Sequence, residues 1–454
     1  MTLRRLILLS LVVFSLACNF LTKAVGALVA PPTPTVTALA PAYVPEGCEA
    51  ALVATVPAAT QLALPTPSLQ GDPSISPTDQ LRVFDEAVKI ITRVYIYPDF
   101  NGMDWSAISA AHRAKTAGGL DTEAFYTQMT SMLGELGDDH SYFESPAEVA
   151  QSEAELAGTS EYVGIGVSVL PDLDAGTLSV VAVFPDSPAA RAGIKPHDRI
   201  LSIDGLPLIE NGEAHLYRVR GPACSALRLT VQSPKEAPRD VLLLRHKIRG
   251  DLPIDVRTVP TTDGSTVGYI MLPSFYDETI PRQVAAALQA FGTLDGLILD
   301  NRENAGGSSD ILESVLAYFV SGTLGHFKSR TAARPLQIEP NPIGNSQTVP
   351  LVVLVGKDTV SFGEISSGVL KDSGRAKIVG QTTLGNVEIL HGYNFDDGSR
   401  LWIAEETFDP GVSHANWEVT GIVPDVEAYA AWDTFTFETD PSLQAALTLL
   451  RKRP

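Results

Sequence analysis

The sequence contains few cysteines and few basic residues for its length of 454 residues. Only 3 cysteines are present, and 33 Lys and Arg residues stand against 53 Asp and Glu residues, which gives a formal net charge of -20. An acidic surface repels phosphate backbones and anionic lipid head groups, and no basic run longer than the RKR near the C-terminus offsets this charge. Nucleic acid is therefore excluded as an expected partner.

Motifs for metals and nucleotides are also missing. The chain has no H-E-x-x-H, no pair of cysteines at zinc spacing and no Walker-type glycine loop. We therefore expect no metal site and no cofactor. The contents of 44% hydrophobic and 19% charged residues are typical of a globular chain, and the length is sufficient for two or three domains.

An apolar run from Leu6 to Ala17 follows two arginines in MTLRRLILLSLVVFSLAC. The run is too short to favour a membrane span, so it predicts a secretory signal over residues 1–17 and a mature chain outside the cytoplasm. The small Ala17 directly before Cys18 indicates lipoprotein cleavage, with Cys18 lipidated and the protein anchored to the cell membrane. Ordinary cleavage near Ala27, which gives a secreted protein, and an uncleaved anchor are the alternatives.

Apart from Cys18, the sequence has two cysteines, Cys48 and Cys224. In an oxidising compartment they either form a disulfide, which ties the N-terminal segment to the middle of the chain, or stay as two separate buried thiols. Cys48 lies within residues 18–77, which are rich in Ala, Pro and Thr and almost uncharged. This composition predicts a semi-extended linker, in which only the segment around Cys48 is a candidate for order.

Amphipathic helices are predicted in the next part of the chain, residues 78–155. The stretch TDQLRVFDEAVKIITRVY places apolar residues three or four positions apart from Leu81 to Tyr95. A second helical pattern, DTEAFYTQMTSMLGEL, opens with Asp121 as N-cap and ends at Gly137. We interpret this part as the helical N-terminal region of a folded core.

Short β-type runs replace the helical pattern over residues 156–250. They read YVGIGVSVL, LSVVAVF, DRILSIDG, LRLTVQS and DVLLLRHKI, with a short helical SPAARAG between the second and the third. In this order the segments resemble a PDZ domain. The resemblance implies that backbone N–H groups of the loop YVGIGV hold the terminal carboxylate of a peptide, while the adjacent strand edge takes the peptide as an extra strand. The implied peptide-binding residues are Tyr162, Val163, Gly164, Ile165, Gly166 and Val167.

Strand and helix patterns alternate over residues 251–430. The apolar runs TVGYIML, DGLILD and PLVVLVG have the length of buried strands, and helical patterns such as SSDILESVLAYFV lie between them. This alternation predicts an α/β layered domain. The amphipathic PSLQAALTLLRK predicts a closing helix in residues 431–454.

Ser361, in TVSFGEISSG, follows a buried strand and begins a helix. The N–H dipoles of a first helical turn favour negative charge beside such a serine, as a nucleophile requires. A serine at this place is, however, usually only an N-cap. The position alone therefore does not distinguish a catalytic serine from a structural one.

Two longer stretches resemble the C-terminal processing, or tail-specific, serine proteases. They are LILDNRENAGGSSDILESVLAYF and LVVLVGKDTVSFGEISSGVLKDSGRAKIVGQTTLGN. The resemblance implies a multidomain α/β protein, in which a crotonase-like layered protease domain carries a helical N-terminal region and an inserted PDZ-like β-domain. It also implies that Ser361 attacks the scissile carbonyl. The implied oxyanion hole consists of backbone N–H groups of Gly306 or Gly307 and of Phe362.

One departure from the family pattern concerns the base. Lysine-dependent members carry their lysine after T-x-G and a glutamine four residues later, where this chain has Asn386 and Leu390. Asparagine cannot accept the serine proton. A second branch, similar to the tricorn protease core, uses a histidine in D-x-H-S/T-x-Y and a glutamate in N-W-E-x-x-G-x-x-P-D. Because GDDHSYF and NWEVTGIVPD match these patterns, the resemblance implies a Ser/His/Glu triad with His140 and Glu418.

Other assignments stay open at this point. His391 is the next candidate base because it follows the same turn, and Glu388 is the alternative carboxylate. Asp139 either raises the basicity of the adjacent His140 or is merely solvated. The expected function is a serine endopeptidase that captures the unstructured C-terminus of a protein or peptide. The alternative is a catalytically silent protein that keeps only the peptide-binding groove.

Overall fold

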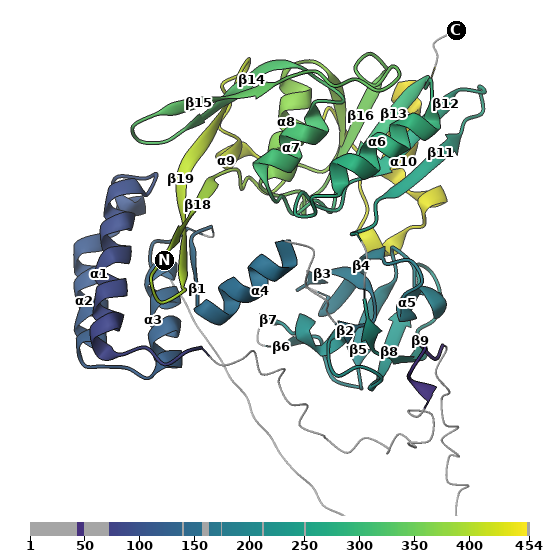
Figure 1. Ribbon diagram of the computed structural model, residues 1–454. Coiled ribbons are helices and arrows are strands. Elements are labelled where there is room, and N and C mark those ends of the chain that lie inside the picture. Colours follow the sequence, from purple (N-terminus) through teal and green to yellow (C-terminus); the bar gives the residue numbers. More distant parts are fainter. Residues whose placement is uncertain are drawn as a thin grey trace, which may run out of the picture. The chain divides into compact units, whose positions relative to one another are not determined.

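The computed structural model describes residues 43–49, 72–138, 140–156, 163–173, 175–210, 213–248 and 251–451 (Figure 1). The predicted signal segment with Cys18, most of the predicted linker, Asp139 and Tyr162 lie outside the described residues. None of the helices within these ranges has the length and apolar character needed to cross a bilayer.

A six-stranded sheet forms the centre of the C-terminal half, in the order β11-β12-β13-β16-β17-β20. Its strands are β11 Asp255–Pro260, β12 Thr266–Met271, β13 Gly296–Asp300, β16 Leu351–Val355, β17 Ala376–Gly380 and β20 Val426–Glu427. All neighbouring strands are parallel except β11 and β12. The central strands β13 and β16 are mostly apolar, with the sequences GLILD and LVVLV, as is usual for parallel strands that are covered on both faces.

Side chains of this sheet alternate between two cores. Leu297 and Leu299 of β13 belong to the core that also contains residues of α6 Ile280–Phe291, α7 Ser309–Leu316 and α8 Phe362–Asp372. Ile298, between them, belongs to the core that contains residues of α10 Pro441–Leu450. Helices therefore cover both faces, which confirms the predicted α/β layered architecture.

The closing helix α10 is shorter than the segment 431–454 that was expected to contain it. Two short 3-10 turns, η4 Trp432–Thr434 and η5 Phe437–Thr439, precede it. The helix begins after Asp440, whose side chain accepts the N–H groups of Ser442 and Leu443. An N-cap aspartate followed by a proline at the first helical position fixes this start.

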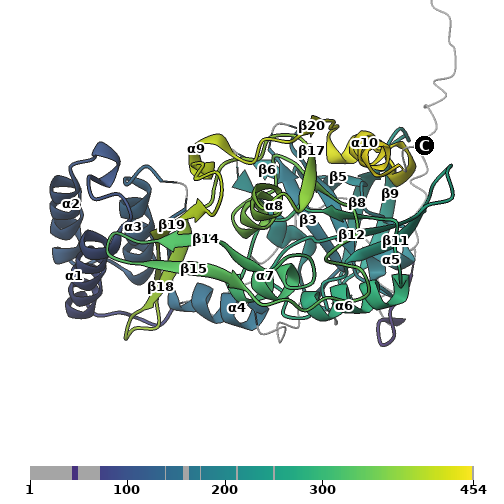
Figure 2. The same cartoon turned by 90° about the horizontal axis from the view of Figure 1, so that it is seen from above.

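A second, antiparallel sheet has the order β1-β19-β14-β15, and β18 also pairs with β19. Its strands are β1 Tyr142–Glu144, β14 Gly322–Lys328, β15 Ala333–Ile338, β18 Ile389–Asn394 and β19 Arg400–Pro410. The helices α1 to α3, within residues 77–134, share a core with residues of β19, and both views show these three helices beside β18 and β19 (Figures 1 and 2). Strand β1 therefore carries the chain from this helical region directly into the sheet.

The N-terminal helices are α1 Pro77–Val94, α2 Trp105–Ala117, α3 Thr122–Gly134 and α4 Pro146–Leu156, with a 3-10 turn η2 Phe100–Gly102. Helix α3 starts as predicted, because the Asp121 side chain accepts the N–H of Ala124, but it ends three residues before Gly137. Helix α2 was not predicted. Its buried face includes His112 and Thr116, so it lacks a clear apolar period.

Residues 163–247 form a PDZ-like part around a five-stranded antiparallel sheet of order β3-β4-β5-β8-β9. Its strands are β3 Val167–Asp172, β4 Thr177–Val183, β5 Arg199–Ile203, β8 Ala226–Gln232 and β9 Arg239–Leu244. The smaller elements are β2 Val163–Gly164 paired with β10 His246–Lys247, β6 Ile209–Glu210 paired with β7 Glu213–Ala214, α5 Pro188–Arg191 and η3 Leu216–Val219. Strand β3 pairs only with β4 among the described strands, so one of its edges is open.

Segment 43–49 is attached to the PDZ-like part by a disulfide between Cys48 and Cys224. Their Cα atoms are 5.1 Å apart, and Cys48 is buried. The guanidinium of Arg191 lies over the ring of Tyr43, 5.7 Å from its centroid. Of the two alternatives for these cysteines, the structure shows the disulfide.

Candidate active site

Ser361 stands directly before the first residue of α8. Its backbone has φ 56° and ψ -125°, a conformation that residues other than glycine rarely adopt. The Ser361 N–H donates to Asn386 O at 2.8 Å and lies 3.3 Å from Glu364 Oε2. Strained turns between a strand and a helix present the nucleophile in other hydrolases, so this outlier supports a catalytic Ser361 over a simple cap.

Gly306 packs directly against this turn. A Cβ atom at Gly306, which has φ 83°, would lie 2.8 Å from Ser361 Cβ and 3.1 Å from both Ser361 Oγ and Phe362 N, so only glycine fits. The Gly306 N–H already donates to Asn304 Oδ1 at 2.9 Å. By contrast, the N–H groups of Gly307 and Phe362 have no acceptor among the described residues. These two groups are therefore the donors left for an oxyanion.

Glu364, in the first turn of α8, is fully buried and receives four hydrogen bonds. Its Oε1 accepts from Thr383 Oγ1 at 2.5 Å and from Gly385 N–H at 2.8 Å. Its Oε2 accepts from Asn386 N–H at 2.8 Å and from Ser361 N–H at 3.3 Å. Burial raises the pKa of Glu364, although these bonds oppose the rise. The carboxylate holds the loop before β18 against the turn of Ser361.

Asn386, which stands where lysine-dependent members have their base, acts through its backbone. Its carbonyl oxygen accepts the Ser361 N–H, and its own N–H donates to Glu364. The Asn386 side chain makes no hydrogen bond within the described part of the chain. It therefore supports the turn and supplies no base.

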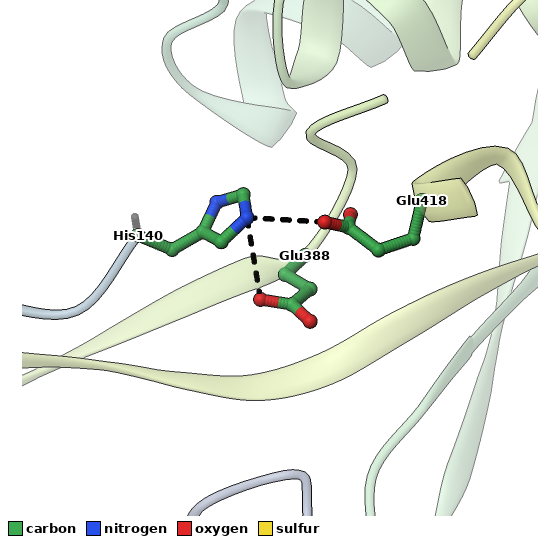
Figure 3. Close-up of side chains that lie close together, drawn as sticks. All are labelled: His140, Glu388 and Glu418. Atoms are coloured by element: carbon green, nitrogen blue, oxygen red, sulfur yellow. Dashed lines mark hydrogen bonds and ion pairs between the residues drawn. The ribbon is translucent and has the colours of Figure 1, made fainter. Parts of the chain in front are cut away.

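His140 reaches the same loop from the N-terminal region. The Asp138 carboxylate accepts the backbone N–H groups of His140 at 3.0 Å and of Ser141 at 2.6 Å, which fixes the turn before β1. His140 Nε2 lies 3.1 Å from Glu418 Oε1 and 3.5 Å from Glu388 Oε2 (Figure 3). Because Glu418 belongs to the short helix α9 Trp417–Thr420 and Glu388 lies just before β18, three distant segments meet at this imidazole.

Each of the two carboxylates has its other oxygen held by a separate donor. Glu418 Oε2 accepts the Val387 N–H at 2.7 Å, and Glu388 Oε1 accepts the Tyr97 hydroxyl. Glu388 is only 3% exposed, and its Oε2 has no hydrogen-bond partner in the described structure. One oxygen of each carboxylate is therefore turned toward His140 Nε2.

The two carboxylates make His140 more basic. Burial by itself lowers the pKa of His140, but the hydrogen bond to Glu418 and the charges of Glu388 and Glu418 outweigh it, so the pKa is raised. Burial raises the pKa of Glu388 to about 7, and the charge of Glu418 adds to that rise. One imidazole and two carboxylates thus share one small buried space.

The contacts of His140 differ from the expected triad in one respect. In known Ser/His/carboxylate triads Nε2 faces the serine Oγ and the carboxylate lies at Nδ1, but Nε2 of His140 faces Glu418. No hydrogen bond joins Ser361 Oγ to a ring nitrogen of His140 in the described structure. The structure therefore brings the two predicted partners of the serine together. It connects them to Ser361 through the loop of Asn386 and Val387.

His391, the other candidate base, belongs to a different cluster. Its Nε2 lies 3.0 Å from Glu406 Oε2, which also accepts from Arg334 at 2.8 Å. The hydrogen bond to Glu406 raises the pKa of His391. In the described structure no hydrogen bond or ion pair joins this cluster to Ser361.

The loop at the start of the PDZ-like part is held through its carbonyl groups. Gly166 O accepts the Phe184 N–H at 3.0 Å, and Ile165 O accepts the Ala189 N–H at 2.9 Å. A Cβ atom at Gly166, which has φ 81°, would lie 2.2 Å from Ser187 Cβ, so glycine is required. The N–H groups of Ile165 and Gly166 have no acceptor among the described residues, which leaves them available for an anion.

His140, Glu388 and Glu418 also form the one group in the described part of the chain that offers three ligand atoms for a metal ion, all within 4.8 Å of one another. Local sequence spacing does not show such a group, because its members come from three separate segments. Neither Tyr97 nor Glu364 has a role predicted from the sequence. Glu364 lies three residues after Ser361 in the stretch TVSFGEISSG, whereas the partner of Tyr97 is 291 residues away.

Known proteins share both parts of this architecture. The model of Peptidase family S41 matches residues 266–428, and a PDZ domain model matches residues 179–233. A carboxyl-terminal-processing protease of Picosynechococcus sp. is 30% identical over 393 residues, which cover 83% of this chain and 91% of the relative. The chain belongs to the carboxyl-terminal-processing proteases. It is therefore a serine-type peptidase, whose substrates are proteins or peptides.

Other members of the carboxyl-terminal-processing proteases are similar over most of their length. Carboxyl-terminal-processing peptidase 2, chloroplastic, of Arabidopsis thaliana is 28% identical over 368 residues, which cover 78% of this chain and 70% of the relative. The solved structure of a photosystem II D1 C-terminal processing protease has 26% identity and a TM-score of 0.57, and the match covers 82% of this chain and 97% of that one. Bacterial and chloroplastic relatives agree with the extracytoplasmic location expected from the signal segment.

Proposed function

We propose that this protease cleaves its substrates through an acyl-enzyme, with Ser361 as nucleophile, His140 as general base and Glu418 as the carboxylate partner of His140. The contact between His140 and Glu418 carries the proposal, because two separate motifs predicted residues that are 278 positions apart and prove to be neighbours. The loop that binds Glu418 through Val387 also binds Ser361 through Asn386.

The proposed reaction follows the order of other serine peptidases. Ser361 Oγ attacks the carbonyl carbon, and its proton passes to His140. The C–N bond then breaks as His140 returns the proton to the leaving amine, and water hydrolyses the acyl-enzyme by the same route. The N–H groups of Gly307 and Phe362 stabilise the oxyanion. Nε2 faces two carboxylates in this structure. The serine proton is therefore taken either by Nδ1, or by Nε2 once the ring has rotated away from the carboxylates.

We also propose that the PDZ-like part captures the free C-terminus of an unstructured substrate. The open edge of β3 supports this role, since a peptide can pair there as an additional strand. The unpaired N–H groups of Ile165 and Gly166 precede this strand and suit a terminal carboxylate. Capture raises the concentration of substrate near Ser361.

Lipidation of Cys18 and anchoring to the cell membrane are proposed from the sequence pattern alone. Cys18 lies outside the described residues. Metabolic labelling with a fatty acid, compared between the wild-type chain and Cys18→Ala, tests this part independently of catalysis.

Cleavage of an unfolded protein substrate tests the triad. We expect Ser361→Ala and His140→Ala to lower the rate by about 10² to 10⁴, since each removes a group that handles the serine proton. His391→Ala is the matched control, because it removes a histidine that also pairs with a glutamate but lies in another cluster. Asn386→Ala should retain activity, since Asn386 contributes only its backbone.

Two results would contradict the proposal. If His391→Ala loses activity and His140→Ala keeps it, His391 is the general base and the assignment of His140 is wrong. A wild-type chain that cleaves none of the unfolded substrates would indicate a silent peptide-binding protein. For capture, a substrate with an amidated C-terminus should be cleaved more slowly than the same substrate with a free carboxylate, and equal rates would exclude PDZ capture.

A further inference from the structure

The cluster of His140, Glu388 and Glu418 contains more ligand atoms than a catalytic triad uses. Glu418 alone is sufficient to orient His140, yet Glu388 Oε2 also lies 3.5 Å from Nε2. Glu388 is buried, and no hydrogen bond reaches this oxygen in the described structure. A buried carboxylate oxygen without a donor is unfavourable, so its presence calls for a missing partner.

A single hydrogen atom cannot satisfy the three facing atoms. The imidazole carries at most one hydrogen on Nε2, and the 3.1 Å contact places it toward Glu418 Oε1. Glu388 Oε2 then lies beside Nε2 but receives no hydrogen bond from it, because the hydrogen of Nε2 is donated to Glu418. A cation at the centre of the group would instead interact with all three atoms at once.

The separations fit a small divalent metal ion. Zinc binds histidine nitrogen and carboxylate oxygen at about 2.0–2.2 Å with tetrahedral angles, so two of its ligand atoms lie about 3.3 Å apart. The two separations measured from Nε2, 3.1 Å to Glu418 Oε1 and 3.5 Å to Glu388 Oε2, lie on either side of this value. All three ligand atoms are within 4.8 Å of one another.

The outer contacts also resemble those of a metal site. Val387 N–H holds the second oxygen of Glu418, and the Tyr97 hydroxyl holds the second oxygen of Glu388. Each carboxylate is thereby fixed with a single oxygen toward the centre, as one-oxygen ligands require. Such outer hydrogen bonds orient ligands in known metal sites and strengthen metal binding.

We propose that His140, Glu388 and Glu418 bind one zinc ion, and that the bound ion switches the protease off. Imidazole and carboxylate ligands suit zinc, whereas calcium prefers six to eight oxygen ligands. Bound zinc occupies the histidine that takes the Ser361 proton, so metal and catalysis exclude each other. Only the inhibition rests on the proposed triad; the binding itself depends on the three side chains alone.

Metal binding is measured first, without reference to activity. The tag-free Ser361→Ala protein, which retains all three ligands, is freed of metal and titrated with Zn²⁺ in competition with a chromophoric chelator. We expect one zinc ion per chain and a rise in the melting temperature on addition of zinc. Adding Glu388→Gln should weaken the affinity at least about tenfold and abolish that rise. Calcium at the same concentration should not compete.

A matched control separates this site from surface binding. Glu406→Gln alters the His391–Glu406 pair, which has a similar distance of 3.0 Å but already holds the guanidinium of Arg334. In the Ser361→Ala background it should leave zinc affinity unchanged. Circular dichroism establishes that each variant is folded. The proposal is overturned if zinc does not bind, or if a folded Glu388→Gln variant binds it as tightly as the parent.

Inhibition is then tested in the active protease. Zinc should lower the cleavage rate reversibly, and a chelator should restore it. The rate of each protein is expressed relative to its own rate without metal. On this scale, Glu388→Gln should require at least about tenfold more zinc for half inhibition than the wild-type protease. Equal inhibition of both proteins would exclude this site as the cause. Zinc binding in a chain that shows no cleavage at all would support the site while contradicting the triad.

Discussion

Glu364 and Glu388 are two buried glutamates on either side of one loop, and they are satisfied in opposite ways. Glu364 is wholly buried and accepts four hydrogen bonds. Glu388 is nearly as buried, yet among the described residues it accepts one hydrogen bond, from Tyr97, and its second oxygen has no donor there. Burial raises the pKa of both carboxyl groups.

The difference in hydrogen bonding gives the two glutamates different roles, one structural and one chemical. A carboxylate with every lone pair occupied holds the surrounding backbone in one arrangement, as Glu364 does for the Ser361 turn. A carboxylate with a vacant oxygen beside an imidazole can still accept a proton or a metal ion.

Glu364→Gln should produce the largest loss of stability. An amide offers only one acceptor oxygen, so its NH₂ group would face two of the four donors that the carboxylate now satisfies. At about 1–3 kcal/mol for each unsatisfied buried group, we expect a destabilisation of about 2–5 kcal/mol, together with a loss of most activity. Urea unfolding measures the first and substrate cleavage the second. An unchanged midpoint would show that the four bonds do not hold the turn.

Tyr97→Phe should have an intermediate effect, because it removes the one hydrogen bond that Glu388 accepts from the described residues. Hydrogen bonds to charged groups contribute about 1.5–3 kcal/mol, and part of this is recovered if the carboxyl group takes up a proton. We expect a destabilisation of about 1–2 kcal/mol. In a double-mutant cycle with Glu388→Ala, which removes the acceptor of the Tyr97 hydroxyl, most of this loss should be coupled. Additive losses would show that the two side chains do not interact.

Glu388→Gln should change the free energy of unfolding least, by about 1 kcal/mol or less. The amide oxygen can still accept the Tyr97 hydroxyl, and the substitution removes a buried charge that has no full partner. The same unfolding experiment that detects the loss in Glu364→Gln measures this variant. A loss as large as that of Glu364→Gln would remove the distinction between the two glutamates.

The parts of the site that follow from sequence are those encoded by short local patterns. Ser361 and the glycines at 306 and 307 lie in compact stretches, and the strand and helix around each follow from apolar periodicity. His140 and Glu418 were also predicted, but only through two motifs of a known family. The shared position of these two side chains in space could not be derived from periodicity.

Other parts depend on contacts between distant segments and could not be predicted. Tyr97 and Glu388 are separated by 291 residues, and neither carries a local signal for the other. The orientation of the His140 ring, with Nε2 toward Glu418, likewise depends on the packing of α9 and the loop before β18. Helix α2 was missed for a related reason, because its buried positions include a histidine paired with Glu135.

The bond between Cys48 and Cys224 has a mechanical consequence. The chain before Cys48 is joined to the PDZ-like part through two sulfur atoms, whereas along the backbone it first reaches the folded helices at Pro77. Tension applied to the amino-terminal end is therefore delivered to the PDZ-like part of the molecule. If a reducing agent cleaved the disulfide, the same tension would act on α1 instead. The redox state of this bond therefore determines which part of the protease receives a force applied to the amino-terminal end.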